Sequence, residues 1–237
     1  AEGRGFEPRF PLHFFMMKKA IIFDLDGTLI DSMQLWRNVD QEFLVSRGVA
    51  VPADLFDHLP HGNSFIHTAQ YFKDRFSLLE SVEEIMQIWT DMVSKHYSTD
   101  IALKPGAQEL ILKLHQTGYR IGLGTSNSYE LAEKALSLNG IWTYFQAVTT
   151  GDMHLMGKPY PDIYLHCAKQ LEVLPEDCIV VEDTLAGVQA GSAAGMTVIG
   201  IYDADSEDQH DRMKAVVHAF CRDYAELDGI LWQLLDR

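Results

Sequence analysis

Short apolar segments alternate with helix-like segments between residues 102 and 200, and this alternation limits the fold more than any other feature. Strands that are apolar along their whole length are typical of parallel sheets, in which helices between the strands cover both faces. The expected strands are 120–124, 147–150, 178–181 and 196–200, and the expected helices are 107–115, 129–138, 161–171 and 185–194. The pattern predicts an α/β fold with a doubly covered parallel sheet.

Residues 33–101 have a different pattern, in which apolar residues recur at helical spacing and no convincing strand is present. These residues are Leu35, Trp36, Val39, Phe43 and Leu44, and then Ile85, Ile88, Trp89, Met92 and Val93. The segment is therefore predicted to be a helical insert between the first strand and the rest of the sheet. Residues 16–32 and 102–237 form the expected core, and residues 1–15 are treated as an extension outside it.

Two aspartates follow the apolar run 20–23 directly, in the sequence Asp24-Leu25-Asp26-Gly27-Thr28. A period of two sends Asp24 and Asp26 to the same side of a strand, and Gly27 allows a tight turn beyond them. An ordinary Asp-Gly turn would need no second aspartate at the strand end. Two carboxylates this close repel each other unless a cation is present, and open α/β sheets place their chemistry at such strand ends.

A second acidic pair, Glu182 and Asp183, follows the apolar run 178–181. The carboxyl ends of neighbouring parallel strands meet in one crevice, so the four acids are expected to lie near one another. Oxygen ligands without clustered His or Cys favour Mg²⁺ over zinc. Thr184 is suited to cap the helix that begins near Leu185, but capping alone does not explain two consecutive acids.

The composition excludes some classes of partner. The formal net charge of −15 gives no basic footprint for nucleic acid and disfavours anionic membranes. Three cysteines at unrelated spacings are typical of buried thiols in a reducing compartment. Neither a membrane span nor an export signal is recognisable, so a cytoplasmic location is expected. The protein is also expected to be a monomer.

Two glycine-containing segments come close to nucleotide-binding motifs without matching them. The segment 122–127 lacks the third glycine of a dinucleotide-binding turn, and Lys158 is preceded by the wrong glycine spacing for a phosphate-binding P-loop. Both segments still contain candidate site residues. Thr125 follows the strand 120–124, and Lys158 stands just before the expected helix at 161–171.

Four motifs together resemble the haloacid dehalogenase-like hydrolase superfamily, in the subgroup of β-phosphoglucomutase, phosphoglycolate phosphatase and related sugar-phosphate phosphatases. They are Asp24-x-Asp26-Gly27-Thr28, Thr125-Ser126-Asn127, Gly157-Lys158-Pro159-x-Pro161-Asp162, and Glu182-Asp183-Thr184 with Gly187. The resemblance extends over nearly the whole chain from Lys19. It implies a Rossmann-like core with an inserted α-helical cap, and a small phosphorylated metabolite as the partner.

The residues permit phosphatase chemistry through an aspartyl-phosphate intermediate. Mg²⁺ and Lys158 neutralise the phosphate so that Asp24 can attack phosphorus, and Asp26 protonates the departing alkoxide and later accepts a proton from water. Thr125, with Ser126 and Asn127, is expected to hold the phosphoryl oxygens.

The resemblance also implies a set of metal ligands. These are Asp24, the main-chain carbonyl of Asp26, and Asp183, whereas Glu182 binds the metal directly or through water.

The expected function is therefore Mg²⁺-dependent hydrolysis of a small phosphate monoester, of the sugar-phosphate or phosphoglycolate type. Dehalogenation is disfavoured because halide release needs no acid at Asp26. A phospho-acceptor signalling domain is disfavoured because it needs neither that acid nor a large insert. The alternative function is a phosphosugar mutase of the β-phosphoglucomutase type. In that mutase, as the resemblance implies, a histidine near the cap delays hydrolysis, and Trp36 takes its position here.

The substrate is expected to be selected by the insert. The polar loop 57–64 carries His58 and His61, and His61 is the candidate substrate-binding residue. The aromatic residues of the insert are expected to form its core.

Overall fold

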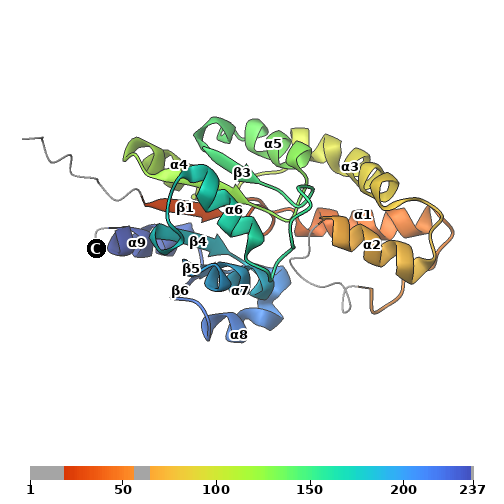
Figure 1. The fold of residues 1–237 in the computed structure, drawn as a ribbon. Helices are drawn as coiled ribbons and strands as arrows, with labels where there is room; N and C mark the ends of the chain where they lie inside the picture. Colours follow the sequence, from red (N-terminus) through yellow and green to blue (C-terminus); the bar gives the residue numbers. More distant parts are fainter. Residues whose placement is uncertain (1–18, 56–64, 236–237) are drawn as a thin grey trace, which may run out of the picture.

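The computed structural model describes residues 19–55 and 65–235, and within them six strands form one parallel sheet in the order β3-β2-β1-β4-β5-β6 (Figure 1). The strands are β1 (Ala20–Phe23), β2 (Arg120–Gly124), β3 (Ala147–Thr149), β4 (Cys178–Glu182), β5 (Thr197–Ile201) and β6 (Ala219–Cys221). The predicted parallel sheet is confirmed. Five strands, β1 to β5, agree with the sequence prediction to within one residue at each end, and β6 was not predicted.

Strand β1 lies in the middle of the sheet, where it pairs with β2 on one side and β4 on the other. All four of its residues are fully buried, as are hydrophobic residues along β4 and β5. This burial on both faces explains why the strands are apolar without alternation. The register places Phe23 beside Leu123 and Val181, so the residues that follow these strands emerge together at one edge.

Helices cover both faces of the sheet. One buried cluster joins Ile22 and Val180 to α6 and α7, and another joins Ile21 and Val181 to α4, α5 and α9. The helices are α4 (Ala107–Gln116), α5 (Tyr129–Leu138), α6 (Asp162–Leu171), α7 (Leu185–Ala193), α8 (His210–Lys214) and α9 (Tyr224–Leu235). Short 3₁₀ helices are η1 (Trp142–Tyr144), η2 (Pro175–Asp177) and η3 (Ala204–Gln209). This doubly covered sheet is the expected Rossmann-like arrangement.

Three further helices lie beyond the carboxyl ends of the strands and extend away from the sheet (Figure 1). They are α1 (Met33–Val45), α2 (Phe65–Phe76) and α3 (Val82–Thr99), and together they are called the cap below. Trp89 is buried in their midst and packs against the rings of Phe43, Phe65 and Phe72. The cap therefore has an aromatic core. That the cap folds as a separate domain stays a prediction.

The chain enters and leaves the cap through two adjacent segments. The amide of Asp31 donates to Ala102 O at 3.3 Å, and that of Lys104 donates to Leu29 O at 2.8 Å. On the far side, the amide of Phe65 donates to Ser126 O at 2.9 Å, which ties the cap to the loop after β2. An ion pair between Arg37 and Asp205 also joins α1 to η3.

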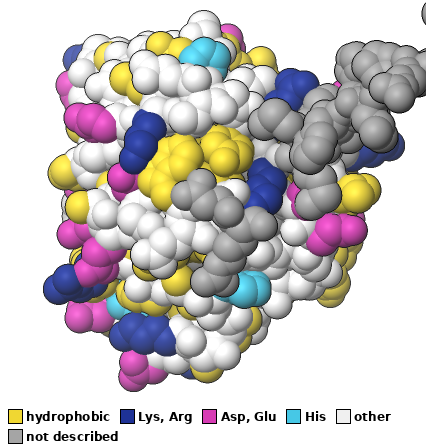
Figure 2. All heavy atoms as spheres, turned by 90° about the vertical axis from the view of Figure 1, so that its left-hand side faces the viewer, with side chains coloured by type: hydrophobic (Ala, Val, Ile, Leu, Met, Phe, Trp, Pro, Cys, Tyr) yellow, Lys and Arg dark blue, Asp and Glu magenta, His cyan; other side chains and the backbone are white. Residues whose placement is uncertain are grey.

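Figure 2 shows the end of the molecule opposite the cap, where acidic and basic side chains are interspersed on the visible face. Among the residues that the structure describes, no helix is both long and apolar enough to span a membrane. His58 and His61 lie outside the described residues, so the predicted role of His61 stays untested.

Candidate active site

The carboxyl ends of β1, β2 and β4 carry the residues of the candidate site. Asp24 follows β1, and its amide extends the ladder to β4 by donating to Val181 O at 3.0 Å. Glu182 ends β4, and Thr125 follows β2. Lys158, from the loop between β3 and α6, joins them. The structure thus brings together acids and a lysine that are distant in the sequence.

Lys158 lies between two carboxylates and is almost completely buried. Its ammonium donates to Asp24 Oδ1 at 2.6 Å and to Glu182 Oε1 at 2.5 Å. Burial opposes the charge of Lys158, but attraction to Asp24 and Glu182 outweighs it, and the pKa of the lysine is raised. Lys158 is therefore a buried cation and not a solvated surface lysine.

Both carboxylate oxygens of Glu182 are fully occupied. Oε1 also accepts from the Tyr164 hydroxyl at 2.8 Å, and Oε2 accepts from the amides of Asp183 and Thr184 and from the Thr184 hydroxyl, at 2.9 to 3.0 Å. A Cβ at Gly187 would lie 1.8 Å from the Glu182 carboxylate, so this glycine leaves the space that Glu182 fills. The arrangement favours Glu182 as the partner of Lys158 over Glu182 as a direct metal ligand.

Asp24 and Asp183 lie in the same buried cluster, where ligand atoms of Asp24, Glu182 and Asp183 are within 4.8 Å of one another. Burial, opposed by the charge of Lys158 and assisted by the charge of Glu182, raises the pKa of Asp24 to about 7. Burial, followed by the charges of Glu182 and Asp24, also raises the pKa of Asp183 well above its usual range. When all three carboxyls are ionised, the single Lys158 ammonium leaves an excess of negative charge, and the raised pKa values of Asp24 and Asp183 reflect burial together with this repulsion.

Gly27 shapes the position of Asp183. Its φ of +79° is in the left-handed region, and a Cβ there would lie 2.2 Å from Asp183 Oδ2. The Thr28 hydroxyl donates to Asp183 Oδ1 at 2.7 Å. Asp183 is thus held against the turn that follows β1. A compact cluster of carboxylate oxygens with excess negative charge fits a hard divalent cation such as Mg²⁺.

Asp26 has different partners from Asp24, although its charge also raises the pKa of Asp24. Its Oδ1 accepts from Ser32 Oγ at 2.5 Å, from Trp36 Nε1 at 3.2 Å and from the Tyr97 hydroxyl. Its Oδ2 accepts from Asn127 Nδ2 at 2.8 Å. The side chain of Asp26 is therefore bound by the cap and by the loop after β2, and it is outside the acidic cluster.

The loop after β2 carries the predicted phosphoryl-binding residues. Thr125 is buried, its amide donates to Thr149 O, and its hydroxyl accepts from the amide of Asn127 at 3.0 Å. Asn127 Oδ1 accepts from the amide of Ser128, which fixes its NH₂ group toward Asp26. Ser126 is the residue whose carbonyl is bound by the cap.

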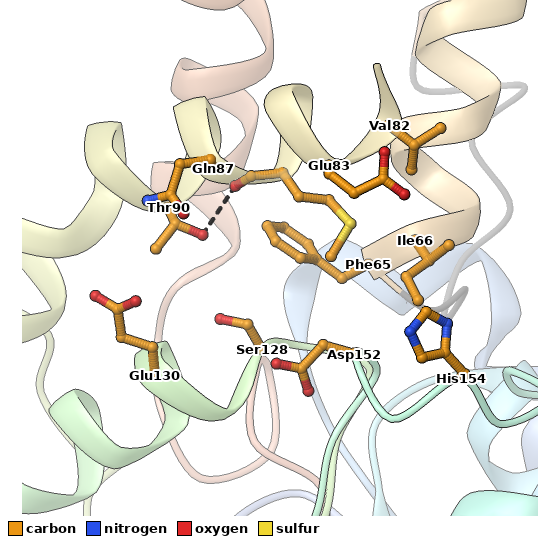
Figure 3. A pocket seen from close by; sticks show the side chains of 11 residues that line it. Phe65, Ile66, Val82, Glu83, Gln87, Thr90, Ser128, Glu130, Asp152 and His154 are labelled. Atoms are coloured by element: carbon orange, nitrogen blue, oxygen red, sulfur yellow. Dashed lines mark hydrogen bonds between the residues drawn. The ribbon is translucent and has the colours of Figure 1, made fainter.

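A cavity of about 260 Å³ lies between the cap and the core, and Ser128, at the end of this loop, is one of the residues that line it (Figure 3). Figure 3 shows Phe65 and Ile66 from α2 facing Ser128 and Asp152 from the core, with His154 at one side. The remaining lining residues are Val82, Glu83, Met86, Gln87, Thr90 and Glu130. The acids and the lysine described above are not among those that line this cavity.

Two tyrosines of the site are not predicted by the sequence pattern. Tyr97 in α3 and Tyr164 in α6 are fully buried, and each hydroxyl donates to a carboxylate of the site. Both residues continue the apolar stripe of a helix, so the pattern treats them as ordinary core aromatics. The available signal is that a buried tyrosine hydroxyl needs a hydrogen-bond partner. A tyrosine in a buried stripe that faces the crevice is therefore a candidate site residue.

Comparison with protein families places most of the chain in a known family. Residues 21–201 match the family described as haloacid dehalogenase-like hydrolase. The match begins in β1 and ends in β5, so it contains both acidic pairs, Lys158 and the cap.

Among similar proteins, hexitol phosphatase B of Escherichia coli is 29% identical over 182 residues, which cover 76% of this chain and 82% of that protein. Beta-phosphoglucomutase of Bacillus subtilis is 29% identical over 196 residues, covering 77% of this chain and 83% of that protein. The crystal structure of CbbY from Rhodobacter sphaeroides in complex with phosphate has a TM-score of 0.80 at 26% identity. It covers 89% of this chain and 96% of the CbbY chain.

Proposed function

Because the chain belongs to the haloacid dehalogenase-like hydrolase family, we propose that it is a Mg²⁺-dependent phosphatase that hydrolyses a small phosphate monoester of the sugar-phosphate type. Similar proteins support the substrate class, since they include a hexitol phosphatase and a CbbY structure complexed with xylulose-1,5-bisphosphate. The observation that carries the proposal is the buried contact between Asp24 and Lys158, with Asp183 beside it and Asp26 nearby.

The residues of the acidic cluster fit Mg²⁺. The carboxylates of Asp24 and Asp183 and the main-chain carbonyl of Asp26 would hold it, with Glu182 retained as the partner of Lys158. When bound, the ion supplies positive charge that offsets the repulsion between a phosphate dianion and a carboxylate nucleophile.

The nucleophile in this proposal is Asp24. Its carboxylate attacks phosphorus, the ester P–O bond breaks, and the phosphoryl group becomes bonded to Asp24 as an acyl phosphate. The Lys158 ammonium opposes the effect of burial and so favours the ionised form of Asp24, and it lies where it can neutralise charge on the phosphoryl oxygens. The Thr125 hydroxyl, whose oxygen already accepts from the amide of Asn127, is left with its proton to donate to the phosphoryl group.

Asp26 is the proposed acid and base. In the first step it gives a proton to the departing alkoxide, and in the second it takes a proton from the water that attacks the acyl phosphate. Inorganic phosphate is then released and Asp24 is regenerated. The need for an acid favours an oxygen leaving group over a halide.

A screen of phosphorylated metabolites tests this function. Purified protein is incubated with hexitol phosphates, hexose phosphates, pentulose phosphates and phosphoglycolate, with Mg²⁺ or with excess chelator, and released phosphate is measured. We expect release from at least one sugar or sugar-alcohol phosphate, in Mg²⁺ only. Release that persists in chelator, or that Asp24→Asn leaves intact, would contradict the proposal.

The mutase alternative is disfavoured by Trp36. Its indole Nε1 donates to Asp26 Oδ1, and an indole cannot exchange a proton with a carboxylate as a histidine can. β-Glucose 1-phosphate, given with a catalytic amount of the bisphosphate, should therefore yield inorganic phosphate, if it reacts at all, and little glucose 6-phosphate. Rapid isomerisation without phosphate release would establish the mutase reaction instead.

A further inference from the structure

Tyr97 stands at the centre of a buried polar cluster that the cap and the core build together. The residue belongs to the last turns of α3 and is fully buried. Its hydroxyl is 2.8 Å from Trp36 Nε1, which belongs to α1, and 3.1 Å from Asn127 Nδ2, which belongs to the loop after β2. The same hydroxyl also contacts Asp26 Oδ1.

The proton positions in this cluster follow from the chemistry of its groups. An indole N–H and an amide NH₂ can only donate, so Trp36 and Asn127 fill the two lone pairs of the Tyr97 oxygen. Its one proton therefore points to Asp26 Oδ1. A phenol carries its proton at neutral pH, so Tyr97 is the donor in this contact.

The donors are distributed unequally over the two oxygens of Asp26. Oδ1 accepts from Ser32, Trp36 and Tyr97, whereas Oδ2 accepts from Asn127 alone. The single Trp36 N–H is shared between the Tyr97 oxygen and Oδ1, but the Ser32 and Tyr97 hydroxyls alone fill the two lone pairs of Oδ1, so this oxygen has no free position for a further proton. Oδ2 retains one, so it is the oxygen on which Asp26 can carry a proton.

We propose that Tyr97 is a positioning residue for the acid–base step, because its hydroxyl fixes Asp26 with Oδ2 as the proton-carrying oxygen. This inference rests on the proposed phosphatase function. Two of the three donors to Oδ1, Trp36 and Tyr97, come from the cap, and Asp26 comes from the core. Ser32 and Asn127 hold the carboxylate from the core side, and the docked cap supplies the remaining donors that fix its orientation.

A series of aryl phosphates tests the proposal without knowledge of the natural substrate. p-Nitrophenyl phosphate has a good leaving group that needs little protonation, whereas phenyl phosphate has a poor one that depends on an acid. For Tyr97→Phe we expect kcat on phenyl phosphate to fall about tenfold or more, and kcat on p-nitrophenyl phosphate to stay within about threefold of the wild type. KM for both should change little.

Two further variants complete the design. Trp36→Phe removes the other donor that the cap supplies and should also affect phenyl phosphate selectively. Tyr71→Phe is the matched control, because Tyr71 is another cap tyrosine whose hydroxyl bonds to Arg75 and not to the site. It should leave both substrates unchanged. Thermal melting of each variant shows whether it is folded.

The outcomes separate this inference from the function on which it rests. An equal loss of kcat on the two substrates, or no loss on either, would show that Tyr97 only stabilises the packing of the cap against the core. Either result would overturn the inference. If Tyr97→Phe does not fold, Trp36→Phe decides by the same criterion. Failure of the wild type to hydrolyse any aryl phosphate or phosphorylated metabolite would refute the phosphatase function, and the inference with it.

Discussion

Asp40 allows a direct test of the energetics of the cap. The residue lies in α1 between Val39 and Phe43, is 9% exposed, and has no assigned role in the proposed chemistry. Burial raises the pKa of its carboxyl from 3.8 to about 7. The substitution Asp40→Asn replaces this titrating group by a neutral one of nearly the same shape.

The sign of the effect follows from linkage. The folded state binds the Asp40 proton more tightly than the unfolded state, so the free energy of unfolding decreases as pH rises from about 4 to about 7. Because a tenfold difference in proton affinity between the two states is worth about 1.4 kcal/mol, the full penalty is about 4 kcal/mol above that window. Between pH 5 and pH 8 the wild type should lose roughly 2–3 kcal/mol relative to Asp40→Asn.

Urea unfolding at pH 5, 6, 7 and 8, in the presence of chelator, measures the difference. The other titrating groups are the same in both proteins, so their contributions cancel in the comparison. For a chain of this length the expected difference corresponds to about 5–10 °C in Tm. Glu42→Gln, which removes an exposed carboxyl from the same helix, is the control and should follow the wild type. Parallel curves for the wild type and Asp40→Asn would refute the reasoning.

Four further predictions concern the site. Asp24→Asn should abolish phosphate release while circular dichroism and Tm show an intact fold, because the amide keeps the shape and loses the nucleophile. Asp26→Asn should reduce turnover of phenyl phosphate far more than that of p-nitrophenyl phosphate, and equal losses would count against Asp26 as the acid. Chelation should remove activity, and added Mg²⁺ should restore it. Ca²⁺ should restore little activity, since it prefers a larger and more flexible site. Equal restoration by both ions would contradict a Mg²⁺ site. Gly27→Ala should cost roughly 1–3 kcal/mol in urea unfolding and raise the Mg²⁺ concentration needed for activity, because its Cβ would collide with Asp183. Gly48→Ala, also at positive φ but with open space around it, is the control and should change only stability.

The sheet could be predicted because its central strands are buried on both faces and must therefore be apolar along their length. The edge strand β6 could not, since it has three residues and two of them are only partly buried. Its pattern is too short and too mixed to distinguish from a loop.

Asp24, Lys158 and Glu182 could be predicted to meet because they follow or precede regular elements whose ends converge. The cap side of the site could not, because no periodic rule relates Tyr97 to Asp26, which is 71 positions away. The contact between Tyr97 and Asp26 depends on how α3 packs against the core. The saturation of Glu182 likewise depends on Tyr164, a residue whose position in the sequence indicates only a buried helix face.

The hydrogen bond between the amide of Phe65 and the carbonyl of Ser126 involves no side chain. It needs the space left by Gly151, because a Cβ added there would lie 1.9 Å from that carbonyl oxygen. Replacement of the side chain at position 65 or 126 leaves both bonding atoms in place, unless proline removes the amide at 65. By contrast, the ion pair of Arg37 with Asp205 disappears with either residue. During evolution the side chains of the cap, and with them the choice of substrate, can therefore change while the backbone hydrogen bond that joins the cap to the loop after β2 is kept.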